Sequence, residues 1–183
     1  MKRNILIGAI LIVILAGLAG YFMLEKDTQK AAERAYLSAR DSDRLSDILN
    51  IQRALEFFAD KHNKEYPQDI YSQAPCKSGT NCGLGSPDAC GNVPCVGTVD
   101  IDSTGRRYTY TYHLTGSRVD AYHLGTSLEN STAPSLTTDR DCNSKTGIAC
   151  PFVSGWNQQA SFDGSDDRGC SGEEGLHCYD VTN

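Results

Sequence analysis

Eight cysteines, all between Cys76 and Cys178, constrain this chain more than any other feature of its sequence. The number is even, no Cys-x-x-Cys pair occurs, and no histidine lies at zinc-finger spacing from them. Such a set is typical of a disulfide framework in an exported protein, because reducing compartments do not maintain the bridges. Zinc binding is the alternative, and the missing ligand spacing makes it the weaker one. The sequence therefore predicts disulfides.

The region from Gln68 to Asn183 has few residues that could build a hydrophobic core. Only 17 of its 116 residues are Leu, Ile, Val or Phe, and so low a share ordinarily predicts disorder. Covalent bridges can offset the shortage, since each is typically worth ~2–4 kcal/mol. We therefore expect a domain that is ordered when oxidised and unstable when reduced.

Loop length is the only guide to how the cysteines pair, because the sequence alone permits many connectivities. Pairing of neighbours along the chain is the simplest arrangement. It predicts the bridges Cys76–Cys82, Cys90–Cys95, Cys142–Cys150 and Cys170–Cys178.

An uncharged apolar run extends from Ile5 to Leu24, and Lys2 and Arg3 precede it. A helix of ~20 residues spans the ~30 Å hydrocarbon core of a bilayer. The positive-inside rule would leave residues 1–4 in the cytoplasm. A cleaved signal peptide is the alternative, although the run exceeds the usual ~7–15-residue apolar core. We therefore expect a single-pass protein of the cytoplasmic membrane, with its N-terminus inside and its C-terminal domain extracytoplasmic.

Residues 25–66 are predicted to continue this helix beyond the membrane. Neither Gly nor Pro occurs from Glu25 to Asp60, and good helix formers predominate there. Leu45, Ile48 and Leu55 belong to an apolar stripe with spacings of three and four, so they should pack on the following domain. The neighbouring charged residues, Asp41 and Arg44 among them, are expected to face solvent. Pro67 should end the helix, because proline disfavours helical geometry in the residue before it.

Residues 67–183 are predicted to form an antiparallel head domain with cysteine-rich loops. Tyr108, Tyr110 and Tyr112 alternate with threonines, which is the two-residue period of a strand. A turn at 115–117 should return the chain as a second strand over 119–128. The predicted fold class is α+β, a long N-terminal helix with a transmembrane first half, packed on a small antiparallel sheet with disulfide-rich loops.

The stretch from Ala39 to Phe58, which closes at Tyr66-Pro67, resembles the helix of bacterial type IV pilin-like proteins and type II secretion pseudopilins. Those proteins commonly contain Ala-Arg-Asp-x-x-Arg, then Ile-Gln-x-Ala-Leu-Glu with an aromatic residue, and then Tyr-Pro. This sequence has the same elements in the same order. It lacks the Gly-Phe-Thr-Leu-Ile-Glu motif of prepilins, and Gly8 is the only early position for a cut. The resemblance implies a pilin-like fold and an atypical member of the family.

Two functions follow from these observations. The first is a structural, non-enzymatic pilin-like or minor pseudopilin-like subunit of a type IV pilus or type II secretion assembly in the cell envelope. The second is an uncleaved, single-pass, membrane-anchored binding module that does not polymerise. Enzyme activity is not expected, since no Gly-x-Ser-x-Gly, His-Glu-x-x-His or phosphate-binding glycine loop occurs.

The expected partners are the membrane and other pilin-like subunits, and any small-molecule ligand is unknown. Ala16 and Gly20 lie one helical turn apart, a spacing that permits close helix packing in lipid, although membrane helices are rich in small residues anyway. The formal net charge of −6 argues against nucleic acid.

No cofactor is expected, although one loop could bind calcium. Calcium takes several carboxylate and carbonyl oxygens from a flexible loop. Asp163, Asp166 and Asp167 surround Gly164 in such a loop, and the family resemblance implies a calcium site in a C-terminal acidic loop. The spacing does not fit an EF-hand, and the sequence favours a solvated acidic loop over a calcium site.

Overall fold

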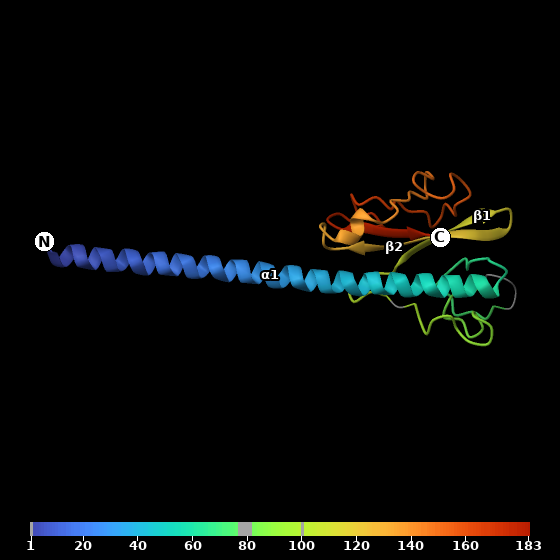
Figure 1. Ribbon diagram of the computed structural model, residues 1–183, viewed down its shortest axis with the longest axis horizontal. Coiled ribbons are helices and arrows are strands. Elements are labelled where there is room, and N and C mark those ends of the chain that lie inside the picture. Colours follow the sequence, from blue (N-terminus) through green and yellow to red (C-terminus); the bar gives the residue numbers. More distant parts are fainter. Residues whose placement is uncertain (1, 77–81, 100) are drawn as a thin grey trace. The chain divides into compact units, whose positions relative to one another are not determined.

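The computed structural model describes residues 2–76, 82–99 and 101–183, with side chains from residue 25 onward and at Leu18 and Tyr21 (Figure 1). It divides into two compact units, an N-terminal unit, Met1–Ala39, and a C-terminal unit, Arg40–Asn183. The elements in chain order are α1 (Lys2–Lys61), β1 (Thr109–Thr115), β2 (Arg118–Leu128), the 3-10 helix η1 (Pro134–Thr137) and β3 (His177–Thr182).

The N-terminal unit contradicts the predicted membrane anchor. Within the described residues, no helix combines the length and the apolar character needed to cross a bilayer. A span needs about 20 predominantly apolar residues, whereas charged side chains recur in each turn of α1 from Glu25 onward, as at Lys26, Asp27 and Lys30. The transmembrane half of the fold class and the single-pass localisation in the cytoplasmic membrane are therefore wrong. Of the predicted span, only Leu18 and Tyr21 have described side chains, so Ala16 and Gly20 lie outside them.

Within the C-terminal unit, the last part of α1 carries the predicted apolar stripe. Ile48 and Leu55 are fully buried, and Leu45 is half-buried against a small cluster around Leu128. The helix ends at Lys61, before the predicted boundary, because Asn63 and Lys64 adopt left-handed backbone angles (φ 55° and 63°). Their conformation closes the last turn, as a left-handed residue commonly does at a helix C-terminus.

The sheet has the order β1-β2-β3, and both strand pairs are antiparallel. The predicted hairpin is confirmed, with Thr115 opposite Arg118 and Gly116 in the turn at φ 67°. The register shifts between His113 and Leu114, which marks a bulge. The C-terminal strand β3, for which the sequence shows no clear alternation, completes the sheet.

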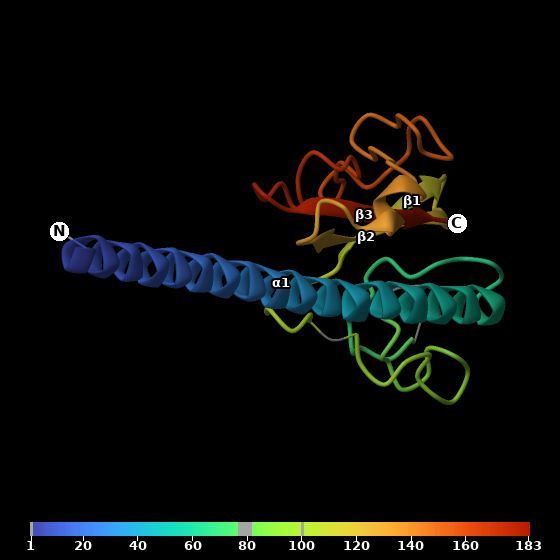
Figure 2. The same ribbon diagram turned by 60° about the vertical axis from the view of Figure 1, so that its left-hand side comes forward.

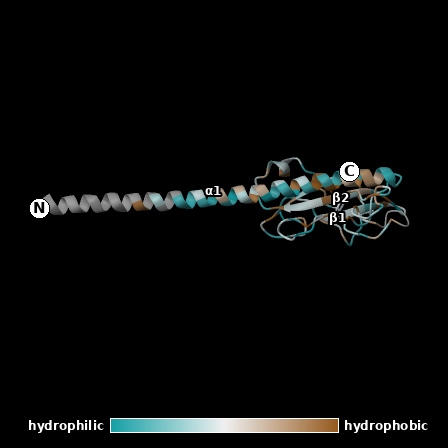
Figure 3. Cartoon of the chain, turned by 90° about the horizontal axis from the view of Figure 1, so that it is seen from below, coloured by the Kyte–Doolittle hydropathy of each residue, from teal (hydrophilic) through white to brown (hydrophobic). Residues whose placement is uncertain are grey.

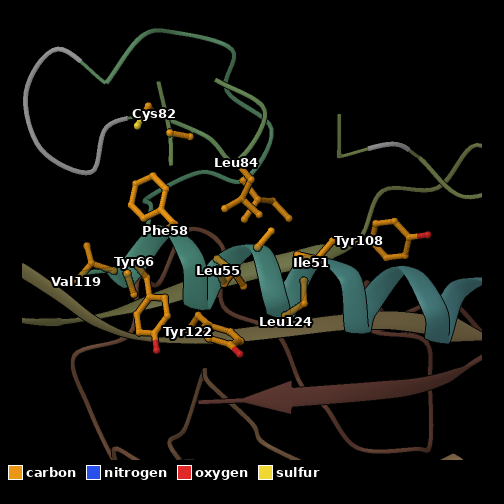
Figure 4. Packing of buried hydrophobic residues seen from close by; sticks show 14 of the residues in the cluster. Ile51, Leu55, Phe58, Tyr66, Cys82, Leu84, Tyr108, Val119, Tyr122 and Leu124 are labelled. Atoms are coloured by element: carbon orange, nitrogen blue, oxygen red, sulfur yellow. The ribbon is translucent and has the colours of Figure 1, made fainter. Parts of the chain in front are cut away.

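Buried residues from three segments form the main core around the last part of α1. The sheet lies on one side of this helical segment, and most of the loop after Pro67 lies on the other (Figures 1 and 2). Phe58 lies near Leu84, whereas Tyr122 and Leu124 come from β2 (Figure 4). Hydrophobic bands appear on α1 where it lies beside the strands, and hydrophilic ones precede them (Figure 3).

All four predicted disulfides are present, with the predicted partners. Cys82, Cys142, Cys170 and Cys178 are buried, whereas Cys90 and Cys95 are half-buried. The bridges therefore occupy core volume that larger aliphatic residues would otherwise fill, as the low Leu, Ile, Val and Phe content suggests.

Candidate functional site

An acidic cluster of Asp139, Asp141 and Asp166 is the candidate site. One carboxylate oxygen of each lies within 4.8 Å of those of the other two. The first two follow η1, and Asp166 comes from the loop that precedes Cys170. The three carboxylates therefore converge from segments separated by 25 residues or more along the chain.

Asp180 on β3 positions the segment that carries two of these aspartates. Its side chain is fully buried and accepts hydrogen bonds from the backbone N–H of Asp141 (2.8 Å) and Cys142 (3.0 Å). Its own backbone N–H donates to Oδ2 of Asp139 (3.3 Å). The backbone turn around Arg140 is thus held against the sheet by the side chain and the backbone of Asp180.

His123 on β2 fixes Asp180 in turn. The fully buried imidazole places Nε2 2.7 Å from Oδ2 of Asp180 and stacks on Phe162 at 3.7 Å between ring centroids. Burial lowers the pKa of His123, although the contact with Asp180 acts in the opposite direction. A neutral imidazole that donates from Nε2 fits this site, because a buried cation is costly.

Burial and mutual repulsion disfavour the ionised forms of the three aspartates in the cluster. Oδ1 of Asp139 and Oδ1 of Asp166 are buried, and within the described part of the chain neither has a hydrogen-bond partner. Burial, together with the carboxylates of Asp166 and Asp180, raises the pKa of Asp139 from 3.8 to about 7. Burial first, and neighbouring carboxylates second, also raise the pKa values of Asp141 and Asp166. A hard divalent cation would relieve this repulsion, and carboxylate oxygens are the ligands that calcium prefers.

The structure brings only one of the three predicted calcium ligands into this cluster. Asp166 belongs to it, whereas Asp163 and Asp167 line a neighbouring pocket of about 280 Å³ that also contains Lys145 and Arg168. The sequence analysis did not predict Asp139 as a ligand, because Asp139 and Asp166 are far apart in the sequence and come together only in the fold. The one local signal is the pair of aspartates around Arg140, just before Cys142.

Among the described residues, two other groupings of potential metal ligands contain cysteines. One joins His123, Cys142 and Asp180, and the other joins His62 to Cys76 and Cys82. All of these cysteines are in disulfides, so they offer no thiolate, which is the form that binds metal. Neither grouping is a metal site while the bridges are intact.

A buried ion-pair network around Arg44 is the second polar feature of the C-terminal unit. The guanidinium is 1% exposed and contacts Asp41 (2.6 Å), Asp102 (2.6 Å) and Glu129 (2.5 Å). Asp41 also accepts hydrogen bonds from the backbone N–H groups of Glu129 and Asn130. The expectation that Asp41 and Arg44 face solvent is therefore wrong, because these partners from distant segments satisfy the charges inside the domain.

The contacts within this network favour the charged forms of Arg44 and Asp102. Burial alone would lower the pKa of Arg44, but hydrogen bonds and charges from Asp102 and Glu129 raise it above its ordinary value. Burial would likewise raise the pKa of Asp102, but hydrogen bonds from Thr104, Arg106 and Arg44 lower it to about 2. Arg44 and Asp102 therefore stay charged at neutral pH. The network joins α1 to the loop before β1 and to the end of β2.

Comparisons with protein-family models, with curated proteins and with solved structures found no match for this chain. The resemblance to pilin-like proteins thus depends on the sequence motifs alone and stays a prediction.

Proposed function

We propose that this chain is a structural, non-enzymatic subunit of an assembly of the type IV pilus or type II secretion kind. In this assembly the N-terminal unit packs against the same unit of other subunits. The proposal rests on the resemblance of residues 39–67 and on one structural observation: the N-terminal unit, taken by itself, is a single helical segment with exposed large side chains.

Isolated helices gain little stability in water, and most helices in proteins are stabilised by tertiary packing. Leu18 is 49% exposed and Tyr21 is 65% exposed. Oppositely charged residues follow at close spacing, including Lys26, Asp27 and Lys30. Such a surface suits contacts with neighbouring copies, in which apolar residues become buried and charges of opposite sign pair.

Cross-linking of the full-length protein tests this proposal. A mixture of ¹⁴N- and ¹⁵N-labelled chains is expected to give mixed-isotope cross-links at Lys26 and Lys30, and sedimentation velocity should show larger species as concentration rises. Lys145, in a loop of the C-terminal unit, is the matched control and should give few mixed links. A monomer at every concentration, without mixed-isotope links at Lys26 or Lys30, would contradict the proposal.

We also propose that Asp139, Asp141 and Asp166 bind calcium and that the ion stabilises the C-terminal unit. The supporting observation is the pair of buried carboxylate oxygens, on Asp139 and Asp166, that have no hydrogen-bond partner among the described residues. Carboxylates in this position are better satisfied by a cation than by water, since both oxygens are shielded from solvent.

Calcium is expected to raise the melting temperature more at pH 8 than at pH 5. The folded-state pKa of Asp139, about 7, lies above its ordinary 3.8, so without a cation the folded state loses stability as pH rises through this range. Calcium binds the ionised form and offsets that loss. At a calcium concentration 100-fold above Kd the gain is about 2.7 kcal/mol.

Thermal unfolding in calcium and in EDTA measures this effect. Asp139→Asn should abolish the calcium response and reduce the loss of stability between pH 4 and pH 7, whereas Asp43→Asn, at an exposed position on α1, should preserve both. An equal calcium response in both variants would show that the ion binds elsewhere.

A further inference from the structure

His113 on β1 lies at a junction between the sheet and the loop that follows Cys150. Its Nδ1 is 2.6 Å from Oδ1 of Asp120 on β2, and its Nε2 is 2.6 Å from the backbone carbonyl oxygen of Ser154. The residue is 5% exposed. Phe152 stacks on the ring at 4.1 Å between centroids, and Trp156 meets it edge-on at 5.5 Å.

Both ring nitrogens of His113 therefore face oxygen acceptors. A neutral imidazole carries one N–H and can donate only once, whereas an imidazolium donates from both nitrogens. Although burial acts to raise the pKa of Asp120, hydrogen bonds from His113 and Thr115 lower it below its ordinary value. Asp120 is thus a carboxylate and accepts, and so does the carbonyl of Ser154. The geometry calls for a doubly protonated ring.

We propose that His113 is a pH-dependent latch, which in its imidazolium form fastens the loop of residues 150–157 to the sheet. The backbone on both sides of the latch supports this assignment. The N–H of Leu114 donates to the carbonyl of Gly155 (2.8 Å), and the N–H of Asn157 donates to the carbonyl of Tyr112 (2.9 Å). The loop is thus aligned along the open edge of β1, with His113 at its centre.

Gly155 brings the loop backbone this close to the ring. Its φ is 97°, and a Cβ atom built there would lie 2.4 Å from Nε2 of His113. Only glycine combines this backbone conformation with such a close approach. Glycine at position 155 therefore permits the close contact between Nε2 of His113 and the carbonyl oxygen of Ser154. This contact is a hydrogen bond only while Nε2 carries a proton.

The latch loosens as the pH rises. The groups that face the ring are the Asp120 carboxylate, the Ser154 carbonyl and the rings of Phe152 and Trp156, while the Thr115 hydroxyl donates to the other oxygen of Asp120 (2.7 Å). When His113 loses one proton, the remaining one stays on Nδ1, because the carboxylate is the stronger acceptor. The Nε2 lone pair then opposes the Ser154 carbonyl oxygen, and the loop is released there.

The loop that the latch fastens carries exposed apolar surface. Val153 is 79% exposed, and Ile148, within the Cys142–Cys150 bridge, is 68% exposed. The carbonyl oxygen of Val153 lies within 2.1 Å of where a Cβ of Gly147 would be, so the two segments are in contact. Protonation of His113 therefore controls how firmly the exposed apolar segment around Val153 is held against the sheet.

Hydrogen–deuterium exchange of the full-length, oxidised protein between pH 5 and pH 9 tests the latch. Exchange of residues 151–157 is divided by the intrinsic rate at each pH to remove its chemical pH dependence. Protection should fall roughly fivefold as pH rises, the effect of losing one ordinary hydrogen bond, while protection in β2 should stay constant. Nitrogen-15 spectra of the His113 ring should show two protonated nitrogens at pH 5.

Two variants separate the latch from a purely structural role. In the His113→Gln variant, the backbone amides of this loop should exchange quickly at every pH. In the Asp120→Asn variant, at a partly exposed position, the loss of protection should occur at lower pH. His62→Gln, in a different loop, is the matched control and should preserve the native profile. Loop protection that does not change with pH, a neutral His113 ring at pH 5, or a native pH profile in His113→Gln would each overturn the proposal.

Discussion

Replacing Arg44 with alanine is expected to lower the free energy of unfolding of the C-terminal unit by about 3–5 kcal/mol. The substitution leaves Asp41, Asp102 and Glu129 without the cation that they share, and the first two have side chains that are 4% and 3% exposed. Removing one partner of a buried ion pair is costlier than never forming the pair, because the remaining charges stay buried and uncompensated. Urea unfolding at pH 7, followed by circular dichroism, measures the loss.

Arg53→Ala is the matched control, because Arg53 lies on the exposed side of the same helix and bonds only to Asn50 among the described contacts. It should change stability by less than about 1 kcal/mol. Arg44→Lys should retain little of the lost stability, since one ammonium cannot replace the three-sided contacts of a guanidinium. Equal stability of Arg44→Ala and Arg53→Ala would show that the network contributes nothing to stability.

Reduction of the four disulfides is expected to unfold most of the C-terminal unit. The bridged cysteines are five to eight residues apart, and closing loops of this size is worth roughly 2–3 kcal/mol each. Together the four bridges contribute about 10 kcal/mol, which is comparable with the ~5–15 kcal/mol total stability of a typical domain. Trp156 is 3% exposed, so its near-ultraviolet circular dichroism reports the packed core. This signal should be lost in a reducing agent at neutral pH.

Removal of single bridges refines this prediction. Replacing Cys170 and Cys178 with alanine should cost more stability than replacing Cys90 and Cys95. The first pair is buried beside Phe162, and Cys178 lies on β3, whereas the second pair is half-buried in a surface loop. A cooperative transition that is unchanged by reduction would show that the hydrophobic core alone is sufficient.

Local patterns in the sequence were enough to predict several elements. The stripe that contains Ile48 and Leu55 and the tyrosine–threonine alternation before Gly116 are periodicities of single elements, so they need no knowledge of distant residues. The disulfide pairing was predictable for a related reason, because each bridge closes a short loop. The boundary of α1 was less predictable, since two left-handed residues end it ahead of Pro67.

The apolar run over Ile5–Leu24 shows how a local pattern can mislead. Its length and lack of charge predicted a bilayer span, yet no helix among the described residues qualifies as one. β3 shows the opposite failure, since its short sequence has no strong alternation and becomes a strand by pairing with β2.

The sequence by itself determined the helix, the hairpin and the covalent framework of this protein, because each depends on residues that are close along the chain. Only the tertiary structure decided which charged groups are buried and what they contact. Arg44 meets Glu129, Asp139 meets Asp166, and His113 meets Ser154 through packing of segments that are 27 or more residues apart. Helical and strand periodicities describe one element at a time, so they cannot show where a distant partner makes burial of a charge favourable.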